Sequence, residues 1–295
     1  MPHLQVGRRF QQFIQRLQPR LADVRRARSH FLQVRACIAK GFAVSKIVPA
    51  GSHAKGTAVQ GISDVDVFTV LRRDEARWGR TFESSSTVLR RVRDQLVGRY
   101  PTTSIRRDEQ AVVIAFRRGE NPVDVVPAFF YRAAPNGYPL YLIPDGTGDW
   151  LTTSPDIHAA YLSDSDARTR GKLKRVVQMV KFWAKWRGTP LGLSSFHTEV
   201  VFASHSVAAG VMPYSEAVCD ALATLRLRQG AALRDPCGVS GLIPATGTET
   251  QRTTLSTALE FAHYHASAAV DAESDGNWRE AVRQWRIVFG EFFPA

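Results

Sequence analysis

The stretch GSHAKGTAVQGISDVDV, residues 51–67, decides the fold that this sequence predicts. A short apolar run ends at Pro49-Ala50, so a strand is expected to lead directly into the Gly51-Ser52 turn. A turn that opens a short helix presents backbone N–H groups and a hydroxyl, and such groups hold phosphate oxygens. The glycine-serine turn therefore predicts a phosphate-binding loop at the end of a strand.

Two carboxylates follow the turn, and a third stands farther along the chain. Asp64 and Asp66 are two positions apart on a predicted strand, so their side chains leave the same face. They repel each other unless a cation lies between them. Asp124 is the single charge in the apolar run Val123 to Val126, where an unpaired buried carboxylate is costly, although a solvent-facing acid at a strand edge also fits. Oxygen ligands of this kind favour Mg²⁺ or Mn²⁺.

The periodicity of the chain changes near its middle. Short runs rich in valine and isoleucine predict strands at 44–48, 65–71, 111–116 and 123–126, with a helix over 83–99. After a stretch rich in proline and glycine at 135–149, helical periodicity dominates at 172–186, 196–208, 216–229, 254–272 and 277–289. We expect an α+β protein in which residues 1–150, including the N-terminal helix, form a catalytic lobe. Residues 151–295 are expected to form a helical lobe, with the active-site cleft between the two.

Composition sets the class of protein and the charge that has to be explained. The 295 residues are 44% hydrophobic and 22% charged, which is typical of a globular protein and excludes collagen-like, disordered and coiled-coil chains. The net charge is +12, and only seven of the 39 basic residues are lysine. The segment Arg8 to Arg35 predicts a basic amphipathic helix broken near Pro19. A membrane surface, a nucleic acid or plain solvent would each suit its basic face.

Cysteine content and hydropathy indicate the compartment. Cys37, Cys219 and Cys237 are too scattered for a disulfide framework or a zinc site. No window holds the roughly eighteen apolar residues that a membrane span needs. We therefore expect a cytoplasmic protein that is not inserted in a membrane.

Around these aspartates the sequence resembles the DNA polymerase β-like nucleotidyltransferase superfamily. Its pattern is a glycine-serine turn, an Asp-x-Asp strand and a third aspartate on a later strand. The turn and both strand motifs look most like the bacterial cGAS/DncV-like nucleotidyltransferases (CD-NTases) of antiphage signalling. Weaker similarities farther along the chain are Gly137-Tyr138, Ile143-Pro144-Asp145, Gly171 to Trp183, Asp235-Pro236 and Trp285 to Gly290. The resemblance runs from about residue 45 to the last residue.

The resemblance implies a polymerase β-like lobe followed by a helical lobe, and a metal-dependent enzyme. Such an enzyme makes a cyclic di- or trinucleotide second messenger from ATP, GTP or pyrimidine nucleoside triphosphates and releases pyrophosphate. By this resemblance Asp64 and Asp66 hold two Mg²⁺ or Mn²⁺ ions. Asp124 binds only the ion that activates the attacking ribose hydroxyl. The resemblance assigns nucleotide binding to Gly51, Ser52, Lys55, Lys181, Ser194 or Ser195, and Phe196, whose ring is expected to stack on the donor base.

The implied partners are the nucleoside triphosphates and an effector that reads the cyclic product in antiviral (CBASS-type) defence. We expect a monomer, with conjugation at the C-terminal Pro294-Ala295 as a hypothesis and nucleic-acid binding left open. An enzyme that adds nucleotides to RNA or protein, or makes a linear oligonucleotide, also fits the turn and carboxylates. A basic nucleic-acid-binding module without turnover is disfavoured, because it has no need of three converging acids.

Overall fold

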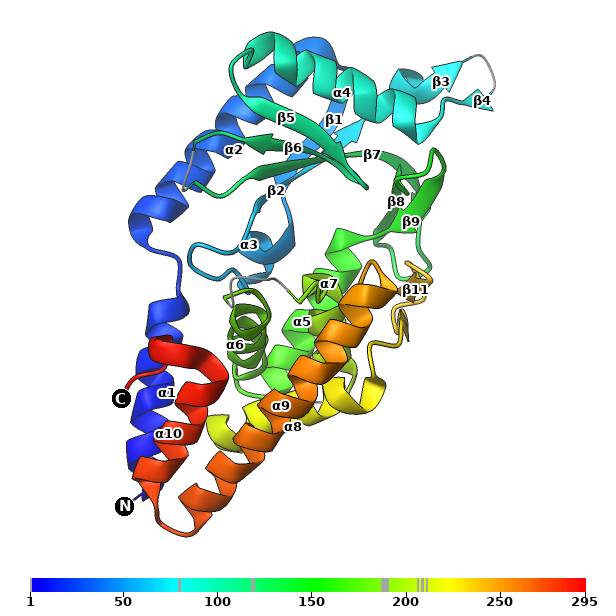
Figure 1. Ribbon diagram of the computed structural model, residues 1–295. Helices are drawn as coiled ribbons and strands as arrows, with labels where there is room; N and C mark the ends of the chain where they lie inside the picture. The colour runs from blue at the N-terminus through cyan, green and yellow to red at the C-terminus, as the bar shows by residue number, and fades with distance from the viewer. Residues whose placement is uncertain are drawn as a thin grey trace. The chain divides into compact units, whose positions relative to one another are not determined.

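The chain divides into two units in the computed structural model, which describes residues 2–78, 81–117, 120–186, 191–205, 207, 210 and 212–295 (Figure 1). The sheet unit is Pro19–Ala159, and the helical unit combines Met1–Gln18 with Ala160–Ala295. The sequence pattern places residues 1–18 with the catalytic lobe, whereas the structure groups them with the helical unit. The N-terminal segment breaks at Pro19 as expected, between α1 (Pro2–Leu17) and α2 (Leu21–Gly41).

The apolar stripe of α1 explains why this helix belongs to the helical unit. Phe10 packs edge-on against Trp285, with ring centroids 5.1 Å apart, and Phe13 lies 4.8 Å from Phe289. Both phenylalanines are fully buried. Although α1 is close to the sheet unit in the sequence, it packs with the helical unit. Burying the two rings there is favourable, because each removes a large apolar area from water.

The sheet unit is built on a mixed sheet. After α2, its elements are β1 (Val44–Pro49), α3 (Gly51–Lys55), β2 (Val65–Leu71), η1 (Arg73–Ala76), β3 (Arg77–Trp78), β4 (Thr81–Phe82), α4 (Ser85–Arg99), β5 (Ser104–Asp108), β6 (Ala111–Ala115), β7 (Val123–Ala133), β8 (Pro139–Pro144) and β9 (Trp150–Thr153). The strand order is β1-β2-β7-β6-β5, with β8 and β9 added beside β7. Among the described strands of this sheet, the β2–β7 pair alone is parallel, since the crossover through α4 returns the chain in the same direction.

Alternation along β2 and β7 assigns each side chain to one face of the sheet. Val65 and Val67 of β2, with Val123 and Val125 of β7, join a core cluster with residues of α2 and α4. These two helices cover that face of the sheet (Figure 1). The intervening positions, including Phe68, face the smaller cluster with β8. Because side chains alternate, the aspartates between these valines are on the face away from α2 and α4.

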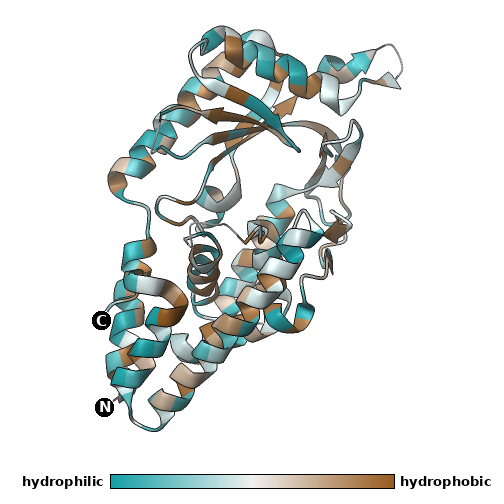
Figure 2. Cartoon of the chain, viewed as in Figure 1, coloured by the Kyte–Doolittle hydropathy of each residue, from teal (hydrophilic) through white to brown (hydrophobic). Residues whose placement is uncertain are grey.

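The helical unit is assembled around α6. Its elements are α1, α5 (Pro155–Arg168, which begins at the end of the sheet unit), α6 (Leu173–Lys185), α7 (Ser195–Ser204), α8 (Tyr214–Arg228), β10 (Leu233–Arg234), β11 (Leu242–Ile243), α9 (Glu249–Ser274), α10 (Trp278–Phe289) and η2 (Gly290–Phe292). Nearly all residues of α6 are buried. The helices α1 and α2 carry both hydrophilic and hydrophobic residues along their length, as Figure 2 shows. A capping box at Thr248 and Gln251 starts α9.

The predicted elements are all present, with shifted ends. The prediction missed strand β8 inside the 135–149 stretch. The prolines of β8, Pro139 and Pro144, are its first and last residues, where a missing N–H does not interrupt the hydrogen bonds in the middle of the strand. It also missed the short strand β5, and β7 continues well past residue 126. The predicted helix 196–208 ends at Ser204, and Ser206 and Ala208 lie outside the described residues. Across the described parts of the chain, no helix combines the length and apolar character that a membrane crossing requires.

Candidate active site

Strand pairing places Asp66 and Asp124 side by side. The parallel register of β2 and β7 aligns Asp66 with Asp124 directly, between the aligned pairs Val65–Val123 and Val67–Val125. Neighbouring strands lie about 4.8 Å apart, so the two carboxylates project from adjacent positions on one face. The structure thus brings together two residues that are far apart in the sequence.

The electrostatics of Asp124 indicate that all three aspartates are close together. Burial, followed by the charges of Asp64 and Asp66, raises the pKa of Asp124 from 3.8 to about 7. Its Oδ1 atom is buried and has no hydrogen-bond partner within the described residues. A buried carboxylate oxygen without a partner is unfavourable by itself and suits a bound cation. The chemistry of this donor set therefore fits a divalent metal.

The glycine-serine turn lies against the same carboxylates. The backbone N–H of Ala50 donates to the carbonyl oxygen of Asp66 at 3.0 Å. Gly51 follows with φ +57°, and a Cβ at this position would lie 1.7 Å from Oδ2 of Asp66. The short helix α3, which carries Ser52 and Lys55, then ends at Gly56 in the left-handed conformation. Gly51 is therefore required both by its backbone angle and by its contact with a catalytic candidate.

Replacing Gly51 with alanine tests that contact. We expect Gly51→Ala to lower product formation about 10²-fold, since displacing a reacting group by ~1 Å has an effect of this size. The matched control is Gly137→Ala, because Gly137 also has a positive φ, +84°, and a Cβ added there would meet nothing within 4 Å. Steady-state rates that fall equally in both variants would attribute the loss to backbone strain alone.

Lys181, expected to contact the triphosphate, is paired inside the helical unit. Its Nζ donates to Oε1 of Glu199 at 2.6 Å, and both side chains are 3% exposed. Glu199 is a residue that the sequence motifs did not indicate. A signal existed, since Glu199 is the lone charge in the apolar run of α7, a pattern that indicates a buried partner.

Two further lysines near the start of α6, Lys172 and Lys174, also have partners in the helical unit. Lys172 donates to the carbonyl oxygen of Met212 and lies 5.5 Å from the ring centroid of Tyr214. Lys174 lies 3.9 Å from a carboxylate oxygen of Asp166. Lys185 is exposed in the last turn of α6. The lysines are therefore not a uniform set of solvent-facing cations.

Removing one member of the buried pair should destabilise the protein. We expect Lys181→Met or Glu199→Gln to lower the free energy of unfolding by about 3–5 kcal/mol, because each leaves a buried charged group without its partner. The double variant Lys181→Met/Glu199→Leu should recover most of that loss. Urea unfolding measures all three variants. Single variants as stable as the unmodified protein would contradict a structural role for the pair.

The two serines before α7 are distinguished by their hydrogen bonds. The Ser194 hydroxyl caps α7 by accepting the N–H of His197 at 3.2 Å, and the Ser194 N–H donates to the carbonyl oxygen of Ala245. The cap leaves Ser195 as the serine whose hydroxyl is not required to begin the helix. Ser195 and Phe196 are both partly exposed at the start of α7. Their assignment to nucleotide binding stays a prediction.

Comparison with known proteins agrees with this geometry. A mixed sheet with aspartates on adjacent strands beside a glycine-serine turn is the arrangement of a nucleotidyltransferase. The model of the Second Messenger Oligonucleotide or Dinucleotide Synthetase (SMODS) domain family matches residues 4–165. The chain belongs to this family, and it is a nucleotidyltransferase of the cGAS/DncV-like group.

Relatives with assigned names are cyclic nucleotide synthases. A probable cyclic nucleotide synthase of Bacillus cereus (strain VD146) is 21% identical over 285 residues, covering 87% of this chain and 84% of the relative. A cyclic AMP-AMP-AMP synthase of Escherichia coli (strain MS 115-1) is 26% identical over 147 residues, covering 49% of this chain and 44% of the relative.

Solved structures show the fold. E. coli MS115-1 CdnC with ATP superposes with a TM-score of 0.72 at 19% identity, over 98% of this chain and 99% of that one. Vibrio cholerae DncV, a cyclic AMP-GMP synthase in complex with a linear intermediate, gives a TM-score of 0.64 at 17% identity, over 84% of this chain and 69% of that one. The predicted fold class, a nucleotidyltransferase with a mixed sheet and helices, is confirmed.

Proposed function

We propose that this protein is a metal-dependent nucleotidyltransferase that joins nucleoside triphosphates into a cyclic di- or trinucleotide and releases pyrophosphate. The observation that carries the proposal is the alignment of Asp66 with Asp124 beside the Gly51 turn, with Asp64 close enough to raise the pKa of Asp124. Membership of the second-messenger synthetase family supports the cyclic product.

The three aspartates fit a pair of divalent cations. Asp64, Asp66 and Asp124 would hold two Mg²⁺ or Mn²⁺ ions, and the partnerless Oδ1 of Asp124 supports this assignment. When bound, such ions neutralise triphosphate charge and lower the pKa of an attacking hydroxyl. Hard oxygen donors favour these ions over softer metals.

The remaining residues of the site bind and orient the substrate. The first turn of α3 offers the Ser52 hydroxyl and backbone N–H groups to phosphate oxygens. Gly51 lets this turn approach Asp66 closely, so a phosphate held there is near the carboxylates. Lys55 of the same helix adds a positive charge. Phosphoryl transfer depends mainly on such positioning and on charge neutralisation.

The nucleotide specificity and biological role follow from the relatives as proposals. ATP or GTP is the proposed substrate, since related structures contain ATP or a linear adenosine-guanosine intermediate. We propose that the product is a second messenger read by an effector in antiphage defence. Ser195 and Phe196 are proposed to contact the nucleotide.

Incubation with nucleotides tests the proposal directly. The purified protein is incubated with Mg²⁺ or Mn²⁺ and the four ribonucleoside triphosphates, treated with phosphatase and examined by mass spectrometry. We expect a phosphatase-resistant cyclic product that disappears when its constituent nucleotide is omitted. Label that appears in added RNA or in protein instead would support transfer to a polymer and contradict cyclisation.

A further inference from the structure

Strand pairing does not hold all three aspartates equally. Asp66 and Asp124 are inside the paired register of β2 and β7, which begins at Val65–Val123. Asp64 precedes the first paired residue. The Val65 N–H donates to the carbonyl oxygen of Pro122 at 2.9 Å, which holds the peptide group after Asp64, whereas the peptide group before Asp64 belongs to the loop that leads into β2. Contacts of that loop therefore complete the placement of this carboxylate relative to the other two.

Asn121 fixes the backbone immediately before Asp64. Its side-chain amide Nδ2 donates to the carbonyl oxygen of Ser63 at 2.7 Å. The hydroxyl of Ser63, which is buried, accepts the backbone N–H of Val59 at 2.9 Å. The residue that leads into β7 thus holds the peptide group that leads into Asp64.

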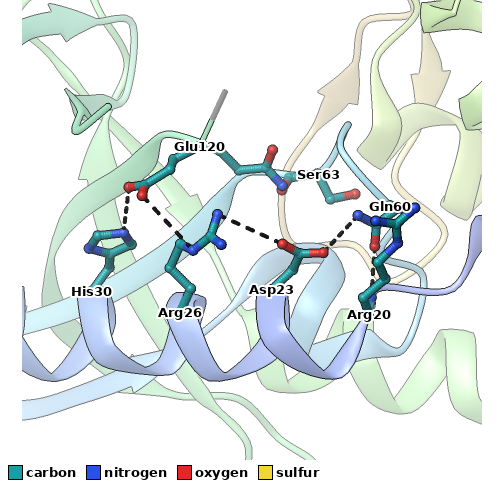
Figure 3. Close-up of polar contacts among 8 residues, drawn as sticks. Arg20, Asp23, Arg26, His30, Gln60, Ser63 and Glu120 are labelled. Carbon is teal, nitrogen blue, oxygen red and sulfur yellow. Dashed lines mark hydrogen bonds and ion pairs between the residues drawn. The ribbon is translucent and has the colours of Figure 1, made fainter. Parts of the chain in front are cut away.

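A row of polar side chains connects α2 to both loops. We call it the α2 ladder, and it consists of Arg20, Asp23, Arg26 and His30 of α2 and its N-terminal boundary, with Gln60 and Glu120 of the two loops (Figure 3). Gln60 accepts the backbone N–H of Arg20 at 2.7 Å and donates to Asp23 at 2.7 Å.

Glu120 connects the same helix to the loop before β7. His30 Nε2 lies 3.0 Å from Oε2 of Glu120, and Arg26 Nε lies 3.9 Å from Oε1. The ring of His30 also stacks on Phe116, with centroids 4.1 Å apart. The ladder therefore contacts both chain segments that deliver the aspartates, through Gln60 on one side and Glu120 on the other.

The α2 ladder can hold the two loops in place because α2 itself is packed into the core of the sheet unit. Val34, Cys37 and Ile38, in the second half of α2, are buried in the core cluster with β2 and β7. The first half borders a cavity of about 70 Å³ beside the two loops, lined by ladder residues, by Asn121 and by apolar side chains such as Ala27 and Val59. In this region the hydrogen bonds of the ladder add a directional connection to the apolar contacts.

We propose that Asn121 and Gln60 are positioning residues that hold Asp64 in place for binding a divalent cation. Asn121 acts on the peptide group before Asp64, and Gln60 fixes the same loop to α2. This inference rests on the proposed function, because it assumes that Asp64 is a metal ligand. It assigns a role in placing Asp64 to two loop side chains and to α2, which are not themselves proposed metal ligands.

Metal affinity tests the inference without turnover. The dissociation constant for Mn²⁺ is measured by electron paramagnetic resonance on the full chain with a non-hydrolysable ATP analogue. We expect Asn121→Ala and Gln60→Ala each to raise it at least fivefold. The matched control is Gln33→Ala, since among the described residues the Gln33 side chain donates to Ser29 within α2 and to no loop. Thermal unfolding of each variant is measured in parallel, and Gln60→Ala keeps the test valid if Asn121→Ala fails to fold.

The outcomes separate the inference from the proposed function. Unchanged Mn²⁺ affinity in both loop variants, with weaker binding in Asp64→Asn, overturns the positioning role and leaves the metal site standing. Unchanged affinity in Asp64→Asn itself overturns the proposed site. An equal loss of affinity in Gln33→Ala also overturns the inference, because the effect is then not specific to the loops.

Discussion

Asp66→Asn is expected to lower the rate of product formation by about 10³-fold, the upper end of the loss when one preorganised electrostatic group is removed from an enzyme. The change keeps the size of the side chain and removes its charge. Asp66 adjoins both Asp124, its register partner, and the Gly51 turn, so the loss affects the centre of the proposed site. Steady-state rates measured with saturating nucleotide and metal report the effect.

Asp94→Asn is the matched control for this variant. Asp94 lies on α4 of the same unit, where its side chain is 54% exposed and lies 2.7 Å from Arg93. Surface ion pairs contribute little to stability, so we expect a rate within about twofold of the unmodified protein. If the rate of Asp66→Asn were also within about twofold of the unmodified protein, another group would have to supply the catalytic charge.

The second large effect is expected at Asp124, in the metal-free protein. The native pKa of about 7 exceeds the usual 3.8, so between these values the folded chain retains a proton that the unfolded chain releases. Stability from this group is therefore present below about pH 4 and is lost as the pH rises toward 7. The rise in the pKa of Asp124 from 3.8 to about 7 corresponds to about 4 kcal/mol. Asp124→Asn should therefore raise the melting temperature at pH 8 by roughly 8–16 °C, since 1 kcal/mol corresponds to roughly 2–4 °C in domains of 150–250 residues.

The same titration governs metal binding. A cation must displace the proton of Asp124, so with a pKa of about 7 the Mn²⁺ affinity should be about tenfold higher at pH 8 than at pH 6. Asp124→Asn should remove this pH dependence and weaken binding at both pH values. Paramagnetic resonance titrations at the two pH values measure it. Equal Mn²⁺ affinity of the unmodified protein at pH 6 and pH 8 would contradict competition between a proton and the metal for Asp124.

Local pattern was sufficient to predict the carboxylate-bearing strands. Alternation of valine with aspartate at Asp66 and Asp124 predicted strands there, and the structure has β2 and β7 at these positions. Asp64, expected on the same strand as Asp66, precedes β2 instead. The spacing could not give the register, because parallel pairing depends on the length and packing of the α4 crossover. The contact of Gly51 with Asp66 could not be predicted either, since it depends on the position of α3 relative to β2.

In the helical unit, the sequence could not predict the partner of a buried charge, because that partner is far away in the chain. Sequence periodicity placed Lys181 on a helix correctly, but it could not show that Glu199 of α7 lies against it. A buried ion pair requires two helices to pack, and no local pattern records which helices do so.

The grouping of α1 with the C-terminal helices has a consequence for synthesis on the ribosome. Residues 19–159 emerge as one block and contain every strand of the large sheet, so the sheet unit can fold while the rest of the chain is still being translated. Phe13 meets its first aromatic partner, Phe182 of α6, about 170 residues later, and Trp285 of α10 follows Phe10 by about 270 residues. At roughly 5–20 residues per second the full cluster therefore takes about 14–54 seconds to emerge. During that interval the nascent chain exposes an aromatic helix face, on which a chaperone can act before the protein is complete.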